Sequence, residues 1–270
     1  MKRLSEASRA IGVFDSGVGG LTVFKALRRE LPREKLVYFG DTARVPYGTK
    51  TKESVTRFSL EIAHFLEKRG IKLLVVACNT ASSLALAALK RELDIPVIGV
   101  IRPAVRAAAS LSRTGTIGLI GTEATVASGA YQRALSTIVR GDRIVARPCP
   151  LFVSLVEEGW WDRPVVRMVA EEYLAPLKRS KMDALILGCT HYPMLAPLLQ
   201  RVVGPKVRLV DSARETALEV RAVLESKGLL RRAGTGSDLF FVTDGAVRVK
   251  RLARRFLGGR SPRVHVARLG

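Results

Sequence analysis

Short apolar runs alternate with longer amphipathic segments along most of the chain. Continuously apolar runs are typical of strands that are covered on both faces. We expect strands at residues 11–14, 36–39, 73–77, 97–100, 116–120, 184–187, 207–210 and 239–242. The segments between them predict helices at residues 21–30, 52–69, 81–93, 124–135, 165–177 and 213–226. Repeated strand–helix units predict an α/β fold with parallel sheets, in which ligands bind at the carboxyl ends of strands.

Two parts of the chain resemble each other weakly. Residues 11–17 are similar to residues 117–122, and residues 74–80 are similar to residues 185–191. In each part a cysteine directly follows an apolar run. The repeat predicts two similar domains, each with a cysteine at the end of one strand.

The crossings between these two domains are expected at two places. One is near Arg102-Pro103, which follows a predicted strand, and the other is near Asp211. The first domain then comprises residues 1–101 and 212–270, and the second comprises residues 102–211.

Composition is typical of a globular protein, with 47% hydrophobic and 26% charged residues in a chain of 270. Three cysteines do not form a disulfide framework, so a cytoplasmic location is expected. The start of the chain carries no apolar run of signal-peptide length. The uncharged stretch 73–89 contains Asn79, Thr80, Ser82 and Ser83, so we interpret it as a strand, a turn and a helix rather than a membrane span.

The formal net charge is +21, which makes nucleic acid a candidate partner. No acidic residue follows Asp244, and eight basic ones do: Arg248, Lys250, Arg251, Arg254, Arg255, Arg260, Arg263 and Arg268. However, the chain has only 6% aromatic residues and no recognised nucleic-acid module. Nucleic acid is therefore an alternative and not the expected primary partner.

Cys78 and Cys189 each lie between a predicted strand and a predicted helix. Asn79 or Thr80 can cap the first helix, and Thr190 can cap the second. Free N–H groups and the helix dipole at such a place favour thiolate, which predicts a pKa below about 8.5. Either cysteine alone is more often a small buried hydrophobe, but two in matching positions favour chemistry. Cys149 lies between two prolines and is interpreted as structural.

His191 lies two residues after Cys189, where an imidazole can exchange protons with the thiol or bind a carboxylate. Cysteine–histidine nucleophilic catalysis, as in a cysteine hydrolase, is an alternative, although it leaves Cys78 unused. The chain has no Cys-x-x-Cys and no paired histidines, so no metal site is expected.

The loop Asp15-Ser16-Gly17-Val18-Gly19-Gly20 follows a predicted strand and precedes a helix. Its glycines let the backbone approach a ligand closely. Thr22 replaces the third glycine of a dinucleotide-binding loop, and no Gly-Lys-Ser/Thr follows, so neither common phosphate loop is present. Asp15 suits an ammonium group or a proton relay, or it caps the helix.

Five segments together resemble the glutamate racemases of the cofactor-independent aspartate/glutamate racemase family. They occur in the family's order and span most of the chain from Ile11 to Asp211: Val13-Phe14-Asp15-Ser16-Gly17-Val18-Gly19-Gly20, Val45-Pro46-Tyr47-Gly48, Ala77-Cys78-Asn79-Thr80-Ala81, Cys149-Pro150-Leu151 running into Glu157, and Leu187-Gly188-Cys189-Thr190-His191-Tyr192-Pro193. Pro46-Tyr47-Gly48 by itself is only a turn signal, and a lone Glu157 is normally a solvated surface group. The basic segment from Ala246 lies outside the resemblance.

The resemblance implies two similar α/β domains with a pseudo-twofold relation and an active site in the cleft between them. It implies interconversion of L-glutamate and D-glutamate without a cofactor, with Cys78 acting on the D enantiomer and Cys189 on the L enantiomer. Asp15, His191 and Glu157 would assist them. The residues implied to bind the amino acid are Asp15, Ser16, Pro46, Tyr47, Gly48, Asn79, Thr80, Thr122, Thr190 and His191.

The resemblance also bears on partners and specificity. His191 after Cys189-Thr190 resembles the glutamate type, whereas the aspartate type more often has Glu at that place. An aspartate racemase or another amino-acid racemase is therefore the alternative within the same chemistry. The expected partners are L- and D-glutamate and a second copy of the chain in a homodimer, with no membrane. D-Glutamate would supply bacterial peptidoglycan synthesis.

Overall fold

The computed structural model of the chain describes residues 6–259 and 261–269. Within these residues the strands form two sheets, and the strand pairs are parallel, as predicted. The first sheet has the order β10-β9-β2-β1-β3-β4, with β1 (Ala10–Asp15), β2 (Lys35–Gly40), β3 (Ile71–Val76), β4 (Val97–Gly99), β9 (Ser237–Val242) and β10 (Val264–Val266). The second has the order β6-β5-β7-β8, with β5 (Thr116–Gly121), β6 (Arg143–Pro148), β7 (Ala184–Gly188) and β8 (Arg208–Asp211).

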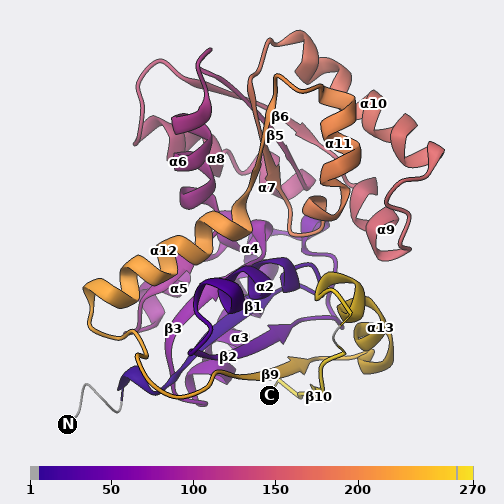
Figure 1. Cartoon of the computed structure of the whole chain (residues 1–270). Helices are drawn as coiled ribbons and strands as arrows, with labels where there is room; N and C mark the ends of the chain where they lie inside the picture. Colours follow the sequence, from indigo (N-terminus) through magenta and orange to yellow (C-terminus); the bar gives the residue numbers. More distant parts are fainter. Residues whose placement is uncertain (1–5, 260, 270) are drawn as a thin grey trace.

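The two sheets share a strand order, which confirms the internal repeat. The strand order β2-β1-β3-β4 in the first sheet corresponds to the order β6-β5-β7-β8 in the second. Cys78 follows β3 and Cys189 follows β7, so both cysteines lie beyond equivalent strands. Figure 1 shows the first sheet below and the second above, in two α/β domains.

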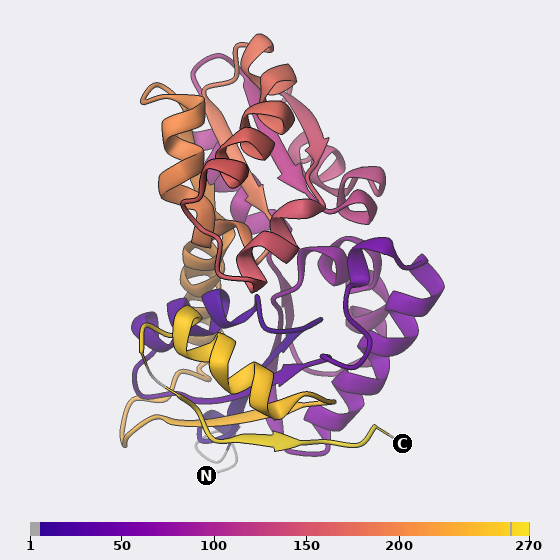
Figure 2. The same cartoon turned by 90° about the vertical axis from the view of Figure 1, so that its right-hand side faces the viewer.

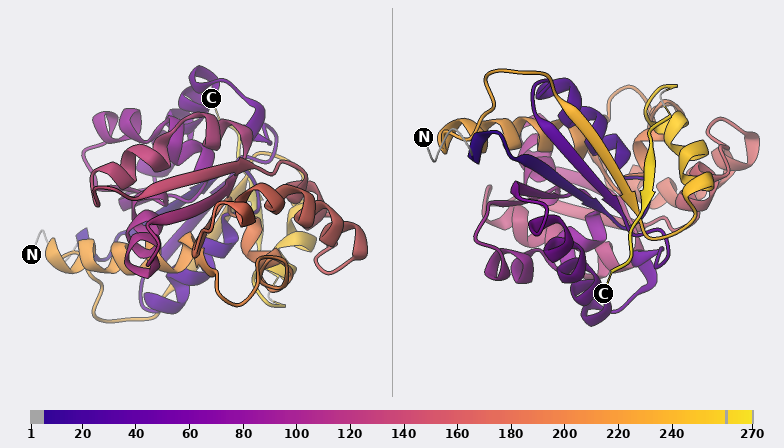
Figure 3. Two further views of the ribbon diagram at one scale, coloured as in Figure 1. Left: turned by 90° about the horizontal axis from the view of Figure 1, so that it is seen from above. Right: turned by 90° about the horizontal axis from the view of Figure 1, so that it is seen from below.

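Alternate residues of the first sheet pack against helices on opposite faces. Ile11 and Val13 pack in one apolar cluster with α2 (Leu21–Glu30), α12 (Ser212–Ser226) and α13 (Ala246–Phe256). Phe14 packs on the other face with α3 (Lys52–Glu67), α4 (Asn79–Leu84) and α5 (Leu86–Glu92). Seen from below, the strands of this sheet run between helices on both sides (Figure 3, right). Burial of both faces explains why these strands are continuously apolar.

The second sheet is covered in the same way. Ile117 and Leu119 pack with α6 (Ile101–Leu111) and α8 (Ala130–Ser136). Leu185 and Leu187 lie in the cluster that contains α9 (Leu151–Glu157), α10 (Pro164–Arg179) and α11 (Ala196–Val203). The remaining short helices are α7 (Glu123–Ala127), η1 (Tyr47–Thr49) and η2 (Tyr192–Leu195).

Helix α12 follows one of the connections between the two domains. After β8 the chain enters α12, which contacts both α6 and α2 and runs from the upper domain along the lower one (Figure 1). The yellow helix α13 then lies on the first domain, below α9 of the second (Figures 1 and 2). Among the described residues, no helix combines the length and the apolar character that crossing a membrane requires.

Several elements differ from the hydrophobic pattern. The helix expected at 81–93 is two helices that meet at Ala85, and the helix expected at 124–135 is interrupted by Gly129, whose φ of 64° is left-handed. β6 was not predicted, because it is a half-exposed edge strand whose apolar run is broken by Arg147. Arg102 and Pro103, where a domain crossing is expected, lie in the first turn of α6.

Candidate active site

A small cavity of about 30 Å³ lies between the two domains. Its walls are loops at the carboxyl ends of β1, β2, β3, β5 and β7, together with α9. The lining residues are Ser16, Val45, Pro46, Tyr47, Gly48, Cys78, Asn79, Thr80, Thr122, Val153, Cys189, Thr190 and His191. Apart from Val45 and Val153, all of them are residues predicted from the sequence. The remaining two predicted residues, Asp15 and Glu157, contact members of this lining.

Cys78 forms the start of α4. Its Sγ accepts a hydrogen bond from the Ala81 N–H at 3.4 Å, so Cys78 is the cap of this helix. The prediction that Asn79 or Thr80 caps the helix is therefore wrong, because the helix begins at Asn79, two residues earlier than expected. The thiol also donates to Ser16 Oγ at 3.5 Å.

The predicted lowering of the Cys78 pKa is also wrong. Burial, together with the nearby charge of Asp15, raises the pKa of this thiol to about 12. The contacts with Ser16 and the Ala81 N–H lower the pKa but do not offset the loss of solvent. Cys78 is therefore a neutral thiol at neutral pH in this state of the protein.

Cys189 lies in a different electrostatic setting. Its Sγ is 3.8 Å from His191 Nδ1, and His191 Nε2 is 3.2 Å from Glu157 Oε1. Arg248 of α13 donates to the other oxygen of Glu157 at 2.9 Å. A chain of four polar groups therefore runs from the surface of the first domain to the sulfur of the second.

The charges along this chain stabilise one another. Burial alone lowers the pKa of His191, but its contacts with Cys189 and Glu157 outweigh burial and raise that pKa to about 10. Burial acts to raise the pKa of Glu157, but the imidazole of His191 and the charge of Arg248 lower it below its ordinary range. His191 is consequently an imidazolium and Glu157 a carboxylate at neutral pH.

Asp15 is fully buried behind the cavity wall. Its carboxylate accepts hydrogen bonds from the Gly17 N–H at 3.0 Å and from Thr190 Oγ1 at 3.5 Å. Burial raises the pKa of Asp15, and the nearby His191 acts in the opposite direction. The prediction that Thr190 caps a helix is wrong, because its hydroxyl is directed to Asp15 and η2 begins at Tyr192. Asp15 therefore links the first domain to the segment that carries Cys189.

Hydroxyl and amide groups meet across the cavity from both domains. Thr80 Oγ1 is 2.9 Å from Thr122 Oγ1 and 3.3 Å from Thr125 Oγ1. Asn79 Oδ1 accepts a hydrogen bond from the Tyr131 hydroxyl at 2.6 Å. Among the described residues, Asn79 Nδ2 is buried without a hydrogen-bond partner. An unpaired buried donor on a cavity wall is suited to bind an anionic ligand.

Two glycines allow the close approach of these segments. A Cβ atom at Gly19 would lie 2.3 Å from Thr190 Oγ1 and 2.5 Å from His191 Nδ1. A Cβ atom at Gly48 would lie 2.7 Å from Thr122 Cβ. Both positions therefore require glycine for contact between the domains.

The Asp/Glu/Hydantoin racemase family model matches residues 11–220. The chain belongs to this family. The glutamate racemase of Geobacter metallireducens is 53% identical over 93% of this chain and 94% of its own. The structure of glutamate racemase isoform RacE1 from Bacillus anthracis matches with a TM-score of 0.94 and 41% identity over 97% of this chain and 98% of that one. The structure of Francisella tularensis glutamate racemase in complex with D-glutamate matches with a TM-score of 0.92 and 36% identity, with the same coverage.

Sequence reasoning missed several residues around the site of this racemase. Val45 and Val153 line the cavity, and Thr125 and Tyr131 contact its polar walls. Val45 is adjacent to the predicted Pro46, but the other three carry no local signal, since they belong to helices of the second domain. Arg248 was noted only as part of the basic segment, and the structure connects it to Glu157.

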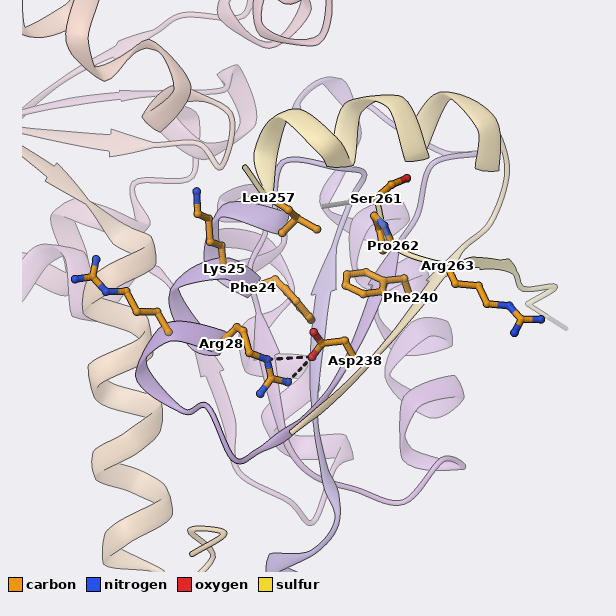
Figure 4. Close-up of a pocket in the computed structure, with 10 residues that line it drawn as sticks. Phe24, Lys25, Arg28, Asp238, Phe240, Leu257, Ser261, Pro262 and Arg263 are labelled. Carbon is orange, nitrogen blue, oxygen red and sulfur yellow. Dashed lines mark hydrogen bonds and ion pairs between the residues drawn. The ribbon is translucent and has the colours of Figure 1, made fainter. Parts of the chain in front are cut away.

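A larger cavity of about 570 Å³ lies elsewhere on the first domain of the racemase. Its apolar floor includes Phe24, Phe240 and Leu257. Figure 4 shows that Arg28 faces Asp238, with which it forms an ion pair, and that the cationic side chains of the rim point in different directions. Polar groups that converge on one point mark a ligand site more clearly than size does. The smaller cavity with the two cysteines is therefore the candidate active site.

The other cysteine and the other two histidines do not line this cavity. Cys149 is fully buried, with its sulfur 3.6 Å from the Arg147 carbonyl. His64 forms an exposed pair with Glu92, and His265 lies in β10. Among the residues that the structure describes, no cluster of three or more His, Cys, Asp or Glu side chains has a metal-binding arrangement.

Proposed function

We propose that this racemase interconverts L-glutamate and D-glutamate by two-base proton transfer between the α-carbon and the sulfurs of Cys78 and Cys189. The observation that carries the proposal is the presence of both thiols, from equivalent positions in the two domains, on the wall of one cavity. The names of the relatives, and the D-glutamate bound to one of them, support glutamate as the substrate.

In the proposed reaction one cysteine acts as thiolate and the other as thiol. The thiolate takes the α-proton, which leaves its bonding electron pair on the α-carbon, and the opposite thiol donates a proton to the other face. The substrate is thereby inverted and the two sulfurs exchange protonation states. Two fixed groups on opposite faces avoid the need for a single base to move around the carbon. The family pattern assigns Cys78 to the D enantiomer and Cys189 to the L enantiomer.

The remaining residues have proposed roles in binding and charge stabilisation. Asn79 Nδ2 donates to the α-carboxylate, where negative charge develops when the proton leaves. Thr80, Thr122 and Thr190 line the same cavity, and Ser16, Pro46, Tyr47 and Gly48 complete the binding surface. Asp15 and Glu157 act through Thr190 and His191 as positioning residues.

The amino acid must enter by separation of the cavity walls. A cavity of about 30 Å³ holds roughly two or three water molecules, which is far less than a glutamate occupies. We propose that the domains, with boundaries at 1–101 plus 212–270 and at 102–211, open at their shared face to admit substrate. Closure then excludes water and strengthens the electrostatic interactions in the site.

The decisive experiment is incubation of the purified protein with L-glutamate in deuterium oxide without added cofactor. We expect loss of circular dichroism together with replacement of the α-proton by deuterium, followed by NMR. L-Aspartate under the same conditions tests the alternative substrate. If L-glutamate keeps both its optical activity and its α-proton, the proposed function is wrong.

The proposed biological role is the supply of D-glutamate for peptidoglycan in the cytoplasm, by a homodimer. Three free cysteines are consistent with a reducing compartment. Expression of the chain in a bacterium that requires D-glutamate is expected to remove that requirement, and the Cys78→Ala variant is the matched control. Sedimentation of the purified chain is expected at the mass of a dimer.

A further inference from the structure

Tyr131 and Asn79 form a buried hydrogen bond between the two domains. The Tyr131 hydroxyl, at the start of α8, donates to Asn79 Oδ1 at 2.6 Å. Tyr131 is fully buried and Asn79 is 2% exposed. A neutral hydrogen bond in such a dry environment is electrostatically stronger than one in water. The contact therefore constrains the side chain of Asn79.

The other end of the same amide is available for a ligand. Asn79 lines the cavity between the domains, and its Nδ2 is buried without a hydrogen-bond partner among residues 6–259 and 261–269. The Asn79 Oδ1 atom thus accepts a hydrogen bond from Tyr131, whereas Nδ2 of the same amide donates none within the described residues. An unused buried donor is destabilising unless a ligand binds it.

The phenolic proton distinguishes the two orientations of the amide. With Oδ1 toward Tyr131, this proton has an acceptor. If the amide were rotated by a half turn, Nδ2 would face the phenol, and the phenolic proton would lose the one hydrogen bond that it makes within the described part of the chain. Burial raises the pKa of Tyr131, so the hydroxyl remains a donor. When Nδ2 binds a carboxylate, the observed form pairs both buried donors, whereas the rotated form leaves the phenolic proton unpaired and is disfavoured.

We infer that Tyr131 is a positioning residue that holds the Asn79 amide with its N–H group directed to the substrate α-carboxylate. This inference rests on the proposed racemisation of glutamate and adds to it a residue outside the cavity lining. Without the phenol the amide is free to present its oxygen, which repels a carboxylate. Tyr131 belongs to the second domain and Asn79 to the first, so the amide acquires its orientation only when the domains are in contact.

The test compares single-oxygen deletions at two buried tyrosines. Tyr131→Phe removes the hydroxyl and keeps the ring. Tyr192→Phe is the matched control, because the Tyr192 hydroxyl is also fully buried but donates to the Cys149 carbonyl at 2.8 Å, within the second domain. We expect Tyr131→Phe to lower kcat/KM for both enantiomers by about 10- to 100-fold, as expected for hydrogen bonds to charged groups. Tyr192→Phe is expected to stay within about threefold of the wild type, since loss of one neutral hydrogen bond has a small effect.

A double-mutant cycle with Asn79→Ala separates positioning from a general loss of structure. If Tyr131 acts through Asn79, then Tyr131→Phe has no further effect on kcat/KM once Asn79 is alanine. Thermal unfolding of each variant gives the stability change independently. Asn79→Asp is expected to be more damaging than Tyr131→Phe, because it presents an anionic oxygen to the substrate while the phenol keeps an acceptor.

The outcomes separate the two levels of the proposal. A wild-type protein that does not racemise glutamate overturns both the proposed function and the inference. An active wild type with an unchanged Tyr131→Phe variant overturns only the inference. Multiplicative effects of Tyr131→Phe and Asn79→Ala also overturn it, because they indicate that the tyrosine acts independently. Loss of activity in Tyr131→Phe that disappears in the Asn79→Ala background supports it.

Discussion

Cys78 and Cys189 follow equivalent strands of two sheets that share a strand order, yet their surroundings differ. Cys78 contacts neutral groups, the hydroxyl of Ser16 and the N–H of Ala81. Cys189 contacts His191, which belongs to an ionic chain with Glu157 and Arg248. The repeat therefore preserves the position of the sulfur but not the charge around it, because the residue that corresponds to His191 in the first part of the repeat is the uncharged Thr80.

In the proposed reaction each sulfur carries the negative charge at one stage. In the proposed mechanism an imidazolium supports the thiolate of Cys189, whereas only neutral donors support that of Cys78. The two half-reactions are therefore chemically unequal, although they act on mirror-image substrates. For enantiomers the equilibrium constant is one, so kcat/KM must remain equal in the two directions and the inequality is expected in kcat.

Removal of either sulfur is expected to have the largest effect. Cys78→Ala and Cys189→Ala should each lower the racemisation rate by about 10²- to 10⁴-fold, the usual contribution of a general acid or base. The remaining cysteine can still take a proton and return deuterium to the same face. NMR in deuterium oxide is therefore expected to show exchange of one enantiomer only, and of opposite enantiomers in the two variants. Exchange of both enantiomers by a single variant would contradict the assignment of one cysteine to each face.

A methyl group at Gly19 is expected to displace Thr190 and His191, the neighbours of Cys189, and so to lower activity. The new Cβ collides with Thr190 Oγ1 and His191 Nδ1. Displacement of a reacting group by about 1 Å can lower activity by about 10²-fold, so we expect a loss of that size in kcat for Gly19→Ala. Circular dichroism and thermal unfolding check that the fold is retained. Full activity in a folded variant would show that His191 can move without cost.

The pH dependence of stability is expected to distinguish the two sides. The pKa of His191 is raised from 6.5 to about 10, so its stabilising contribution is complete below pH 6.5 and is lost as the pH rises through 10. The pKa of Cys78 is raised from 9.0 to about 12, so its contribution to the free energy of unfolding begins to be lost only above pH 9. Between pH 6.5 and 9, the unfolding free energy relative to wild type should change for His191→Asn and stay constant for Cys78→Ala. Urea unfolding across this range measures both, and parallel curves would refute the comparison.

The smallest effect is expected at Arg248. Its side chain is 58% exposed, and exposed ion pairs typically contribute about 0.2–1 kcal/mol. We expect Arg248→Gln to lower kcat by less than about fivefold and the difference to shrink at high salt, where exposed charges are screened. Arg251→Gln, an equal change of charge on the exposed part of the same helix, is the control. An equal loss in both variants would indicate a general effect of charge instead of a contact with Glu157.

Local patterns were sufficient to predict most of the fold. The continuous apolar runs identify nearly all strands of the two sheets, because burial on both faces leaves no polar positions in a strand. The edge strand β6 escapes this rule, since its half-exposed positions tolerate arginine. The broken helices around Ala85 and Gly129 also escape it, because a change of backbone direction does not interrupt the hydrophobic pattern.

The sequence by itself determined where the two cysteines and their polar neighbours lie, since strand ends and helix starts bring Cys78, Cys189 and these neighbours to the same edge of each sheet. It did not determine the contacts between domains, such as Tyr131 with Asn79 and Arg248 with Glu157, because these residues are far apart in the chain. Nor did it determine the direction of the Cys78 pKa shift. The helix start that favours thiolate is a local feature, whereas the burial that outweighs it exists only after the domains have packed together.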